Sequence, residues 1–462
     1  MVKFREEQDS LGKIKVENSK LWGAQTQRSI ENFQIGVGKF HFHQVFIEAL
    51  SLQKKSCALA NLDFKLLKKS HVKVISNVCD LIINQKLNEQ FPLVVWQTGS
   101  GTQINMNINE VIANKGNLIL GKSLPTNSPL HPNDHINKSQ SSNDTIPTAM
   151  HIATVLAIHR DLIPSITQIK KTLKKKINEF KGIIKIGRTH TQDATPIKLS
   201  NEFLAYYDQI QYAESVIKKS LDKLYKLAQG GTAVGSGINA PKGFDKQFIK
   251  HLKKISKLPF KSASNKYEAL ASHDVFVEVF SGIEIFTSTL FKMANDIRVL
   301  SSGPRSGIAE LILPANEPGS SIMPGKINPT QCEALSMVCA HVIGLKNSIT
   351  FACMQGHFQL NVYNPLIINN TLDSIKLISE ATISFDKHCL RGIRANKTKI
   401  QELLKNSLML VTPLTKVIGY DLASKVALNA YNKNISLKES CLKLTNLTEA
   451  EFDKYTNPKN MV

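Results

Sequence analysis

The stretch "EALASHDVFVEVFSGIEIFTSTLFKMANDIRVL", residues 268–300, decides the fold class. Apolar residues occupy nearly every face of a helix drawn through it, over about 50 Å at a rise of about 1.5 Å per residue. Such a helix must be buried on all sides, either in the core of a bundle or between subunits. Charged residues such as Glu284 and Lys292 interrupt the stretch, so it does not have the composition of a membrane span.

Helical periodicity recurs along the rest of the chain, whereas strand-like runs are short and few, such as 92–96 and 183–187. The further predicted helices cover 42–62, 65–87, 105–115, 143–180, 197–228, 243–256, 329–352, 365–390 and 398–406. We therefore expect an all-α, mainly helical chain. No internal repeat or low-complexity linker is evident.

Two natural breaks divide the chain, the polar loop 121–142 and the region after Pro365. They predict three domains. These are an N-terminal domain (1–140), a central helical-bundle domain (141–364) and a small C-terminal helical domain (365–462).

The chain has 462 residues and a formal net charge of +21, which would ordinarily indicate a nucleic-acid partner. The lysines are spread along the whole sequence, however. The densest run, "IKKTLKKKINEFKGIIKI" (169–186), alternates basic and apolar residues as a solvated helix face does. We therefore expect no nucleic-acid partner, and a basic protein would attract a small dianionic substrate.

The N-terminal segment and the cysteines bear on location and on metals. "MVKFREEQDS" (1–10) has no apolar segment of the kind found in a secretory signal, which predicts a cytoplasmic protein with no membrane partner. The seven cysteines are scattered, without a CxxC pair or a zinc-like Cys/His spacing. Reduced thiols are expected, and neither a metal nor a cofactor is.

Four polar loops share one design, in which hydroxyl and amide donors precede a predicted helix. They are "QTGSGTQINMNINEV" (97–111), "NKSQSSNDTIPTAMH" (137–151, with Pro147 expected in the first helical turn), "GRTHTQDATP" (187–196, before a helix opening at Pro196) and "EPGSSIMPGKINPTQCEA" (317–334). Helix capping explains any one of them taken alone. Four loops with surplus donors indicate instead an anionic ligand held at helix N-termini.

The donors in these loops favour carboxylates over nucleotides, because no glycine-lysine phosphate loop is present. The glycine-rich stretch "GGTAVGSGINAP" (230–241) lacks both nucleotide-binding spacings and predicts a tight, closely packed loop.

Several of the loop residues could act chemically. His190 alone would more often be structural, but Glu333 could orient it. Lys326 and Asn328, held between prolines, can stabilise developing negative charge. Ser320 is a feeble base in water, and a nearby lysine and backbone N–H groups would stabilise its alkoxide.

These motifs resemble, in order, those of the fumarase/aspartase superfamily, whose signature GSSxMPxKxNP matches residues 319–329. The supporting matches are "WGAQTQRS" (22–29), "HPND" (131–134), "SQSSND" (139–144), "GGTAVGSG" (230–237), "NKYEALASHD" (265–274) and "SLMLVTPLTKVIGYD" (407–421). The resemblance covers essentially the whole chain. Gly325, the "PTQCE" that follows it, and His190 favour the class II, iron-independent fumarate hydratases over the aspartases.

The resemblance implies a hydro-lyase that interconverts fumarate and L-malate, a substrate pair of the tricarboxylic acid cycle, by trans addition or elimination of water without a cofactor. It implies the catalytic residues Ser320, His190, Glu333, Lys326 and Asn328. It further implies that the dicarboxylate is bound by Lys326 and Asn328 together with Ser100, Thr102, Ser141, Ser142, Asn143 and Thr189. Whether the serine or the histidine is the main base stays open.

The resemblance also implies a homotetramer of 222 symmetry with a twenty-helix core, in which each active site draws loops from three subunits. A long apolar helix would then be buried by subunit contact.

Two departures from the family pattern stand out. Many relatives have a second dicarboxylate site, here His131, Asn133 and Asp134, with an arginine three residues before the histidine. Ser128 occupies that position, so a dianion should bind there weakly or not at all. Thr191 replaces the usual leucine beside His190, and its effect stays open.

Two alternatives remain at this point. An aspartate ammonia-lyase of the same superfamily would release ammonia from L-aspartate. A basic nucleic-acid-binding or structural protein would account for the charge, although it would not need the intact set of site residues.

Overall fold

The computed structural model describes residues 3–462, and these residues form two compact units. Of the described residues, unit 1 comprises 3–164, Glu214–Glu284 and His341–Ile378. Unit 2 comprises Ser165–Ala213, Ile285–Ala340 and Ser379–Val462. The three-domain division drawn from the sequence stays a prediction.

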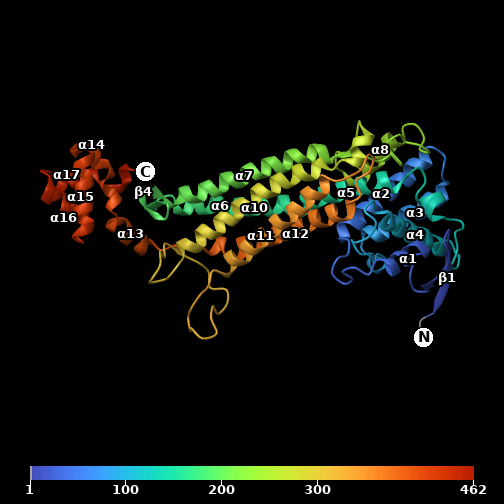
Figure 1. Cartoon of the computed structure of the whole chain (residues 1–462), viewed down its shortest axis with the longest axis horizontal. Helices are drawn as coiled ribbons and strands as arrows, with labels where there is room; N and C mark the ends of the chain where they lie inside the picture. Colours follow the sequence, from blue (N-terminus) through green and yellow to red (C-terminus); the bar gives the residue numbers. More distant parts are fainter. Residues whose placement is uncertain (1–2) are drawn as a thin grey trace. The chain divides into compact units, whose positions relative to one another are not determined.

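Unit 1 opens with an antiparallel hairpin in which Phe4 pairs with Glu17. Its helices α2, α3, α4, α5 and α8 then pack against one another (Figure 1). Its elements are β1 (Phe4–Asp9), β2 (Gly12–Glu17), α1 (Ala24–Asn32), α2 (Gln44–Asp63), α3 (Lys69–Ile83), η1 (Asn88–Gln90), α4 (Thr102–Ile119), η2 (Pro132–Ile136), α5 (Ser142–Ala157), η3 (Ile158–Leu162), β5 (Lys226–Leu227), α8 (Phe244–Ser256), β6 (Lys261–Ser262) and α9 (Lys266–Ala271).

Unit 2 contains a second hairpin and the small C-terminal helices, which gather around a core that includes Leu414, Val426 and Phe452 (Figure 1). Its elements are α6 (Ile163–Phe180), β3 (Ile184–Thr189), β4 (Gln192–Lys198), β7 (Leu311–Ile312), η4 (Leu390–Gly392), β8 (Arg394–Ala395), α13 (Lys397–Asn406), η5 (Leu408–Leu414), α14 (Thr415–Ile418), α15 (Tyr420–Asn432), α16 (Leu437–Leu444), α17 (Glu449–Tyr455) and η6 (Pro458–Asn460).

Apart from α6, whose first two residues belong to unit 1, four long helices contribute residues to both units: α7 (Leu199–Leu224), α10 (Asp274–Leu300), α11 (Thr330–Cys353) and α12 (Asn364–His388). Among the helices of residues 3–462, α11 alone has the length and apolar composition of a membrane span. Only 22% of its apolar window is buried within the chain, and Met337 and Phe351 are exposed. Its apolar surface is therefore largely uncovered in the single chain.

The stretch 268–300 is helical but not continuous, which corrects the expectation of one unbroken helix. Ser272 has extended backbone angles (φ −113°, ψ 137°), so α9 ends there and α10 begins at Asp274. The buried ring of His273, in the gap, hydrogen-bonds the Asn364 side chain at 2.5 Å. One stripe of α10, including Phe291 and Val299, remains exposed in the single chain.

Candidate active site

The loop before α4 is held without a serine or threonine cap. Gly101, in the left-handed region at φ +74°, is the N-cap, and the side-chain oxygen of Gln97 accepts the Ile104 N–H at 3.0 Å. The hydroxyls of Ser100 and Thr102 lie 2.9 Å apart. They remain beside the free N–H groups of the helix start, where an anion is favoured.

Gly99 locks this loop against the segment before α12. A Cβ added at Gly99 would lie 1.4 Å from the carbonyl oxygen of Val362, so no other residue fits there. The Gly99 carbonyl accepts the Asn364 N–H at 3.0 Å. The glycine of this motif therefore serves close backbone approach.

The loop before α5 ends in a capping box. The Ser141 hydroxyl accepts the Asn143 N–H at 3.2 Å, and the Asp144 carboxylate accepts the Ser141 N–H at 2.9 Å. Pro147 lies further inside α5, because the helix already begins at Ser142; this corrects its placement in the first turn. The capping interpretation of this loop is confirmed, and the ligand interpretation stays a prediction.

Asp144 also anchors the glycine-rich stretch 230–241. Its second oxygen accepts the N–H groups of Gly230 and Thr232 at 2.9 and 3.0 Å, and the Gln229 side-chain amide at 2.9 Å. The stretch is thus a closely packed loop, as predicted. Burial raises the pKa of the Asp144 carboxyl to about 6, against the opposing effect of these hydrogen bonds.

A buried amide joins the two loops of unit 1. The Asn105 side-chain N–H₂ group donates to the Ser142 hydroxyl at 2.9 Å, and Asn105 is fully buried. Segments 97–105 and 137–144, which we call the binding loops, therefore meet in one place. The structure brings together five of the predicted dicarboxylate-binding residues, namely Ser100, Thr102, Ser141, Ser142 and Asn143.

His190 lies at the tip of a hairpin, not ahead of a helix. Strands β3 and β4 pair up to Thr189 and Gln192, so His190 and Thr191 form a two-residue loop, and α7 opens at Leu199 instead of Pro196. Both loop residues have positive φ, 54° and 60°. Such two-residue loops favour Asn and Gly, which is why "HT" did not indicate a hairpin.

Buried ion pairs hold the base of this hairpin. The fully buried Glu310 carboxylate accepts two hydrogen bonds of 3.0 Å from the Arg188 guanidinium. Lys185 Nζ lies 3.1 Å from the same carboxylate and 2.8 Å from that of Glu202. Ion pairs therefore anchor strand β3 from Lys185 to Arg188, while His190 and Thr189 at the tip are exposed. Sequence reasoning missed Glu310, for which no local pattern exists.

The segment 317–328, which we call the signature loop, is closed by its own backbone. Gly319 N–H donates to the Lys326 carbonyl at 3.0 Å, and a Cβ at Gly319 would lie 2.2 Å from that oxygen. The Ser320 hydroxyl accepts the N–H groups of Ile322 and Met323 at 3.3 and 3.0 Å. The Asn328 amide donates to the Gly319 carbonyl.

The residues expected to do chemistry are not assembled within the single chain. Lys326, His190 and Glu333 are exposed, and within residues 3–462 no hydrogen bond or ion pair joins any two of Ser320, Lys326, His190 and Glu333 through their side chains. In unit 1 the donor-bearing segments 97–105 and 137–144 contact each other, whereas in unit 2 Lys326, His190 and Glu333 are exposed in the single chain.

His131, Asn133 and Asp134, the candidate second dicarboxylate site, lie at the start of η2. The His131 Nδ1 atom accepts the N–H groups of Asn133 and Asp134, each at 3.2 Å, and so caps the short helix η2. This capping accounts for the conformation of the segment without a ligand.

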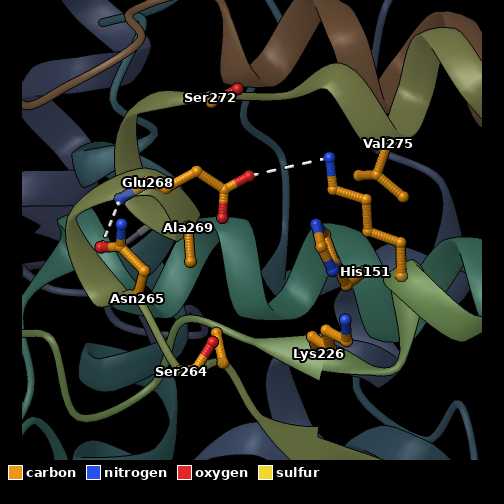
Figure 2. A pocket seen from close by; sticks show the side chains of 10 residues that line it. His151, Lys226, Ser264, Asn265, Glu268, Ala269, Ser272 and Val275 are labelled. Atoms are coloured by element: carbon orange, nitrogen blue, oxygen red, sulfur yellow. Dashed lines mark hydrogen bonds and ion pairs between the residues drawn. The ribbon is translucent and has the colours of Figure 1, made fainter.

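A separate cavity of about 110 Å³ in unit 1 contains none of the predicted residues (Figure 2). His151 borders it, and its Nδ1 atom donates to the Leu224 carbonyl at 3.0 Å. Burial lowers the pKa of His151 to about 4, so the ring is neutral at pH 7. Glu268 and Lys223, 3.8 Å apart, pair across the cavity wall. Within the described residues, no cluster of three or more His, Cys, Asp or Glu side chains is arranged to hold a metal ion.

Comparison with known proteins assigns the chain to a family. A model described as lyase matches residues 12–344, and one described as fumarase C C-terminus matches residues 410–462. The chain is 51% identical over 463 residues to the mitochondrial fumarate hydratase of Dictyostelium discoideum, with 100% of this chain and 95% of that protein covered. It is 49% identical over 459 residues to the class II fumarate hydratase of Haemophilus influenzae, with 99% of each covered. The chain belongs to the class II fumarate hydratase family.

Solved structures agree with this family membership. The class II fumarase of Schistosoma mansoni superposes with a TM-score of 0.97 at 40% identity over 99% of both chains. A fumarate lyase:delta crystallin of Brucella melitensis, in a structure bound to cobalt, gives a TM-score of 0.95 at 36% identity over 99% of both chains. The mainly helical fold predicted from the sequence is confirmed.

Proposed function

We propose that the chain is a hydro-lyase that interconverts fumarate and L-malate. The observation that carries the proposal is identity of about half of all residues to class II fumarate hydratases across the whole chain. The reactive set Ser320, Lys326, Asn328, His190 and Glu333 is intact within it.

Removal of a proton beside a carboxylate produces a dianionic aci-carboxylate, so most of the barrier is charge stabilisation. In our proposal Ser320 takes the C3 proton of malate. Two backbone N–H groups already point to its hydroxyl and would stabilise an alkoxide there. Lys326 and Asn328 hold the carboxylate on which charge develops.

In our proposal, His190 activates the water molecule that becomes the hydroxyl group of malate, or protonates that hydroxyl group when water leaves. Its exposed ring, on a hairpin whose strand β3 is anchored by ion pairs, can reach a substrate held elsewhere. Glu333, also exposed, orients that ring in the assembled site. Which of Ser320 and His190 is the main base is a question for pH–rate measurements on single variants.

The binding loops hold the dicarboxylate. Ser100, Thr102, Ser141, Ser142 and Asn143 lie at the N-termini of α4 and α5, where free N–H groups and the helix dipole favour an anion. Thr189, beside His190, adds a hydroxyl. A second dicarboxylate site at His131, Asn133 and Asp134 is weak, because Ser128 replaces a cation there.

The functional unit in our proposal is a cytoplasmic homotetramer whose active sites combine loops from three subunits. Exposed apolar side chains on α10 and α11 support subunit contact, since Phe291, Met337 and Phe351 are 46%, 69% and 58% exposed in the single chain. Active sites shared between subunits would also explain why the reactive residues are exposed in the single chain.

The experiment is to mix purified protein with L-malate, without added metal, and follow the ultraviolet absorbance of fumarate. We expect fumarate to form at a rate unaffected by a chelator. Ammonia released from L-aspartate, with malate untouched, would identify an ammonia-lyase instead. Neither activity, together with salt-dependent DNA binding, would overturn the enzyme assignment.

A further inference from the structure

Lys54 on α2 is a buried cation without a counter-ion in contact. Its side chain is 0% exposed, and its Nζ donates to the Asn137 and Gln140 side-chain oxygens at 3.0 and 2.9 Å. Within residues 3–462 no carboxylate forms an ion pair with it. Fully buried lysines are almost always paired, because removing a charge from water is costly.

Both hydrogen-bond acceptors of Lys54 lead to the binding loops. The Asn137 oxygen also accepts the Asn105 amide at 3.3 Å, and Asn105 in turn donates to the Ser142 hydroxyl at 2.9 Å. The Gln140 oxygen also accepts the Gln53 amide at 2.9 Å.

The second route continues to the helix cap. The Gln53 amide also donates to the Gln229 oxygen at 2.7 Å, and the Gln229 amide donates to Asp144 at 2.9 Å. One ammonium group therefore lies at the centre of the network that connects segments 97–105 and 137–144.

The titratable groups that face Lys54 come from three helices, namely Cys57 on α2, Cys79 on α3 and Asp144 on α5. Burial keeps both thiols protonated, because it raises the pKa of Cys57 and raises that of Cys79 to about 12. Asp144 is the one anion among them, and its carboxylate already accepts hydrogen bonds from four N–H groups. Burial lowers the pKa of Lys54 to about 8, so it is charged at pH 7 and loses its proton above pH 8.

We propose that Lys54 is a positioning residue that supplies a fixed positive charge beneath the dicarboxylate site and strengthens dianion binding through Asn137, Asn105 and Ser142. The proposal rests on the proposed function, in that the binding loops take a dicarboxylate. Lys54 does not touch the substrate, so it affects affinity more than the chemical step. A dianion that arrives above the network supplies the missing counter-charge, and its binding should hold the proton on Lys54.

The test uses the full-length wild type, Lys54→Met and Lys54→Arg, with Lys55→Met as the matched control. Lys55 is the next residue, and it pairs with a half-exposed Asp80 on α3, away from the network. Succinate, a saturated dianion that cannot be hydrated, is the calorimetric probe. We expect Lys54→Met to weaken succinate binding and raise KM for L-malate about tenfold to thirtyfold, as loss of a nearby charge at intermediate dielectric does. Its kcat should change less than threefold, Lys54→Arg should recover part of the affinity, and Lys55→Met should match wild type.

A series of pH values distinguishes the effect of the Lys54 charge on succinate binding from the effect of its side-chain shape. Wild-type affinity for succinate should fall from pH 7 to pH 9 as Lys54 deprotonates, whereas the affinity of Lys54→Met should not change with pH. At pH 8, calorimetry of the wild type in buffers of different ionisation enthalpy should show proton uptake on binding. This measurement needs no variant to fold.

Either of two results overturns the proposal: no proton uptake by the wild type at pH 8, or a Lys54→Met protein whose affinity and pH dependence match the wild type. A wild type that binds succinate with proton uptake but does not convert malate would refute the proposed function while leaving this inference standing.

Discussion

The binding loops of unit 1 and the reactive loops of unit 2 are built in opposite ways. In unit 1, Asp144 is fully buried and accepts four N–H groups, and Asn105 is buried between two helix starts. In unit 2, His190, Lys326 and Glu333 are exposed, and their charged or ring atoms have no side-chain partner among residues 3–462. Under the proposed function, the single chain brings together the residues proposed to bind the dicarboxylate, and leaves those proposed to react exposed.

This contrast agrees with the roles that we propose for the two parts. A binding site gains from donors that are oriented before the ligand arrives, because no ordering cost remains on binding. Groups that transfer protons must reach the substrate and be shielded from water only when the site closes. Substitutions in unit 1 should therefore lower stability and affinity, and substitutions in unit 2 should lower turnover.

The largest expected effect is on turnover. Ser320→Ala and His190→Asn should each lower kcat by about a thousandfold or more, as removal of a general base or of a proton-transfer group does. Both side chains lie outside the core, so the thermal midpoint and the oligomeric state should stay those of the wild type. The checks are malate-dependent absorbance and size-exclusion chromatography. A variant that is inactive because it dissociates would show that the residue is structural, and the contrast between the units would then fail.

Asp144→Asn should cause the largest loss of stability, about 3 kcal/mol, because one amide oxygen cannot accept the four N–H groups that the buried carboxylate accepts. Succinate binding should be lost with it, since the binding loops lose their common anchor. Urea unfolding and calorimetry measure the two effects. Lys326→Gln, an exposed change in unit 2, is the control and should leave the unfolding midpoint unchanged. Equal unfolding midpoints for wild type, Asp144→Asn and Lys326→Gln would contradict the proposed difference in stability between the two units.

Acid should weaken unit 1 through its buried histidines. Burial lowers the pKa of His151 and of His273 to about 4, from about 6.5 in the unfolded chain. Between these values the unfolded state binds more protons, so each histidine makes stability rise with pH across this window and fall as the pH drops from 6.5 to 4.

The slope of the unfolding free energy against pH measures this linkage. In His151→Phe it should be smaller by one proton, about 1.4 kcal/mol per pH unit. Identical slopes in His151→Phe and wild type would show that His151 is not neutral in the folded state.

Features visible from the sequence were those encoded by neighbouring residues. The cap at Ser141 with an acidic residue three positions later, the packed glycine-rich loop 230–241 and the helical class all follow local rules. The donor-rich loops also predict an anion site from local sequence alone.

Features that depend on distant partners could not be predicted. Three of the four donors to Asp144 lie 85, 86 and 88 residues away in the sequence, and Glu310 contacts Arg188 across 122 residues. The break between α9 and α10 at Ser272 depends on the contact of His273 with Asn364. The hairpin at His190 could not be predicted because "HT" is not a favoured sequence for a two-residue turn. The smallest effect that we expect concerns this turn.

Thr191 is a β-branched residue at φ 60°, a conformation that costs such residues about 1–2 kcal/mol. Its hydroxyl recovers part of this by donating to the His190 carbonyl at 2.6 Å. Glycine fits the second position of this two-residue loop without strain, although it also gives the unfolded chain more freedom. Thr191→Gly should therefore raise stability by only about 0.5–1 kcal/mol, with kcat within about twofold of wild type because His190 keeps its own backbone conformation.

Thr195→Gly is the matched control, since Thr195 lies within β4 and has no positive φ. There glycine should lower stability by about 0.5–1 kcal/mol. Thermal unfolding of both variants decides the matter. Stability changes of opposite sign in the two variants would mean that the backbone at Thr191, beside His190, is strained. The exposed tip would then be held in its conformation by its backbone, even without side-chain partners. The same sign for both would mean that the tip is relaxed and that His190 acquires its position only in the assembled protein.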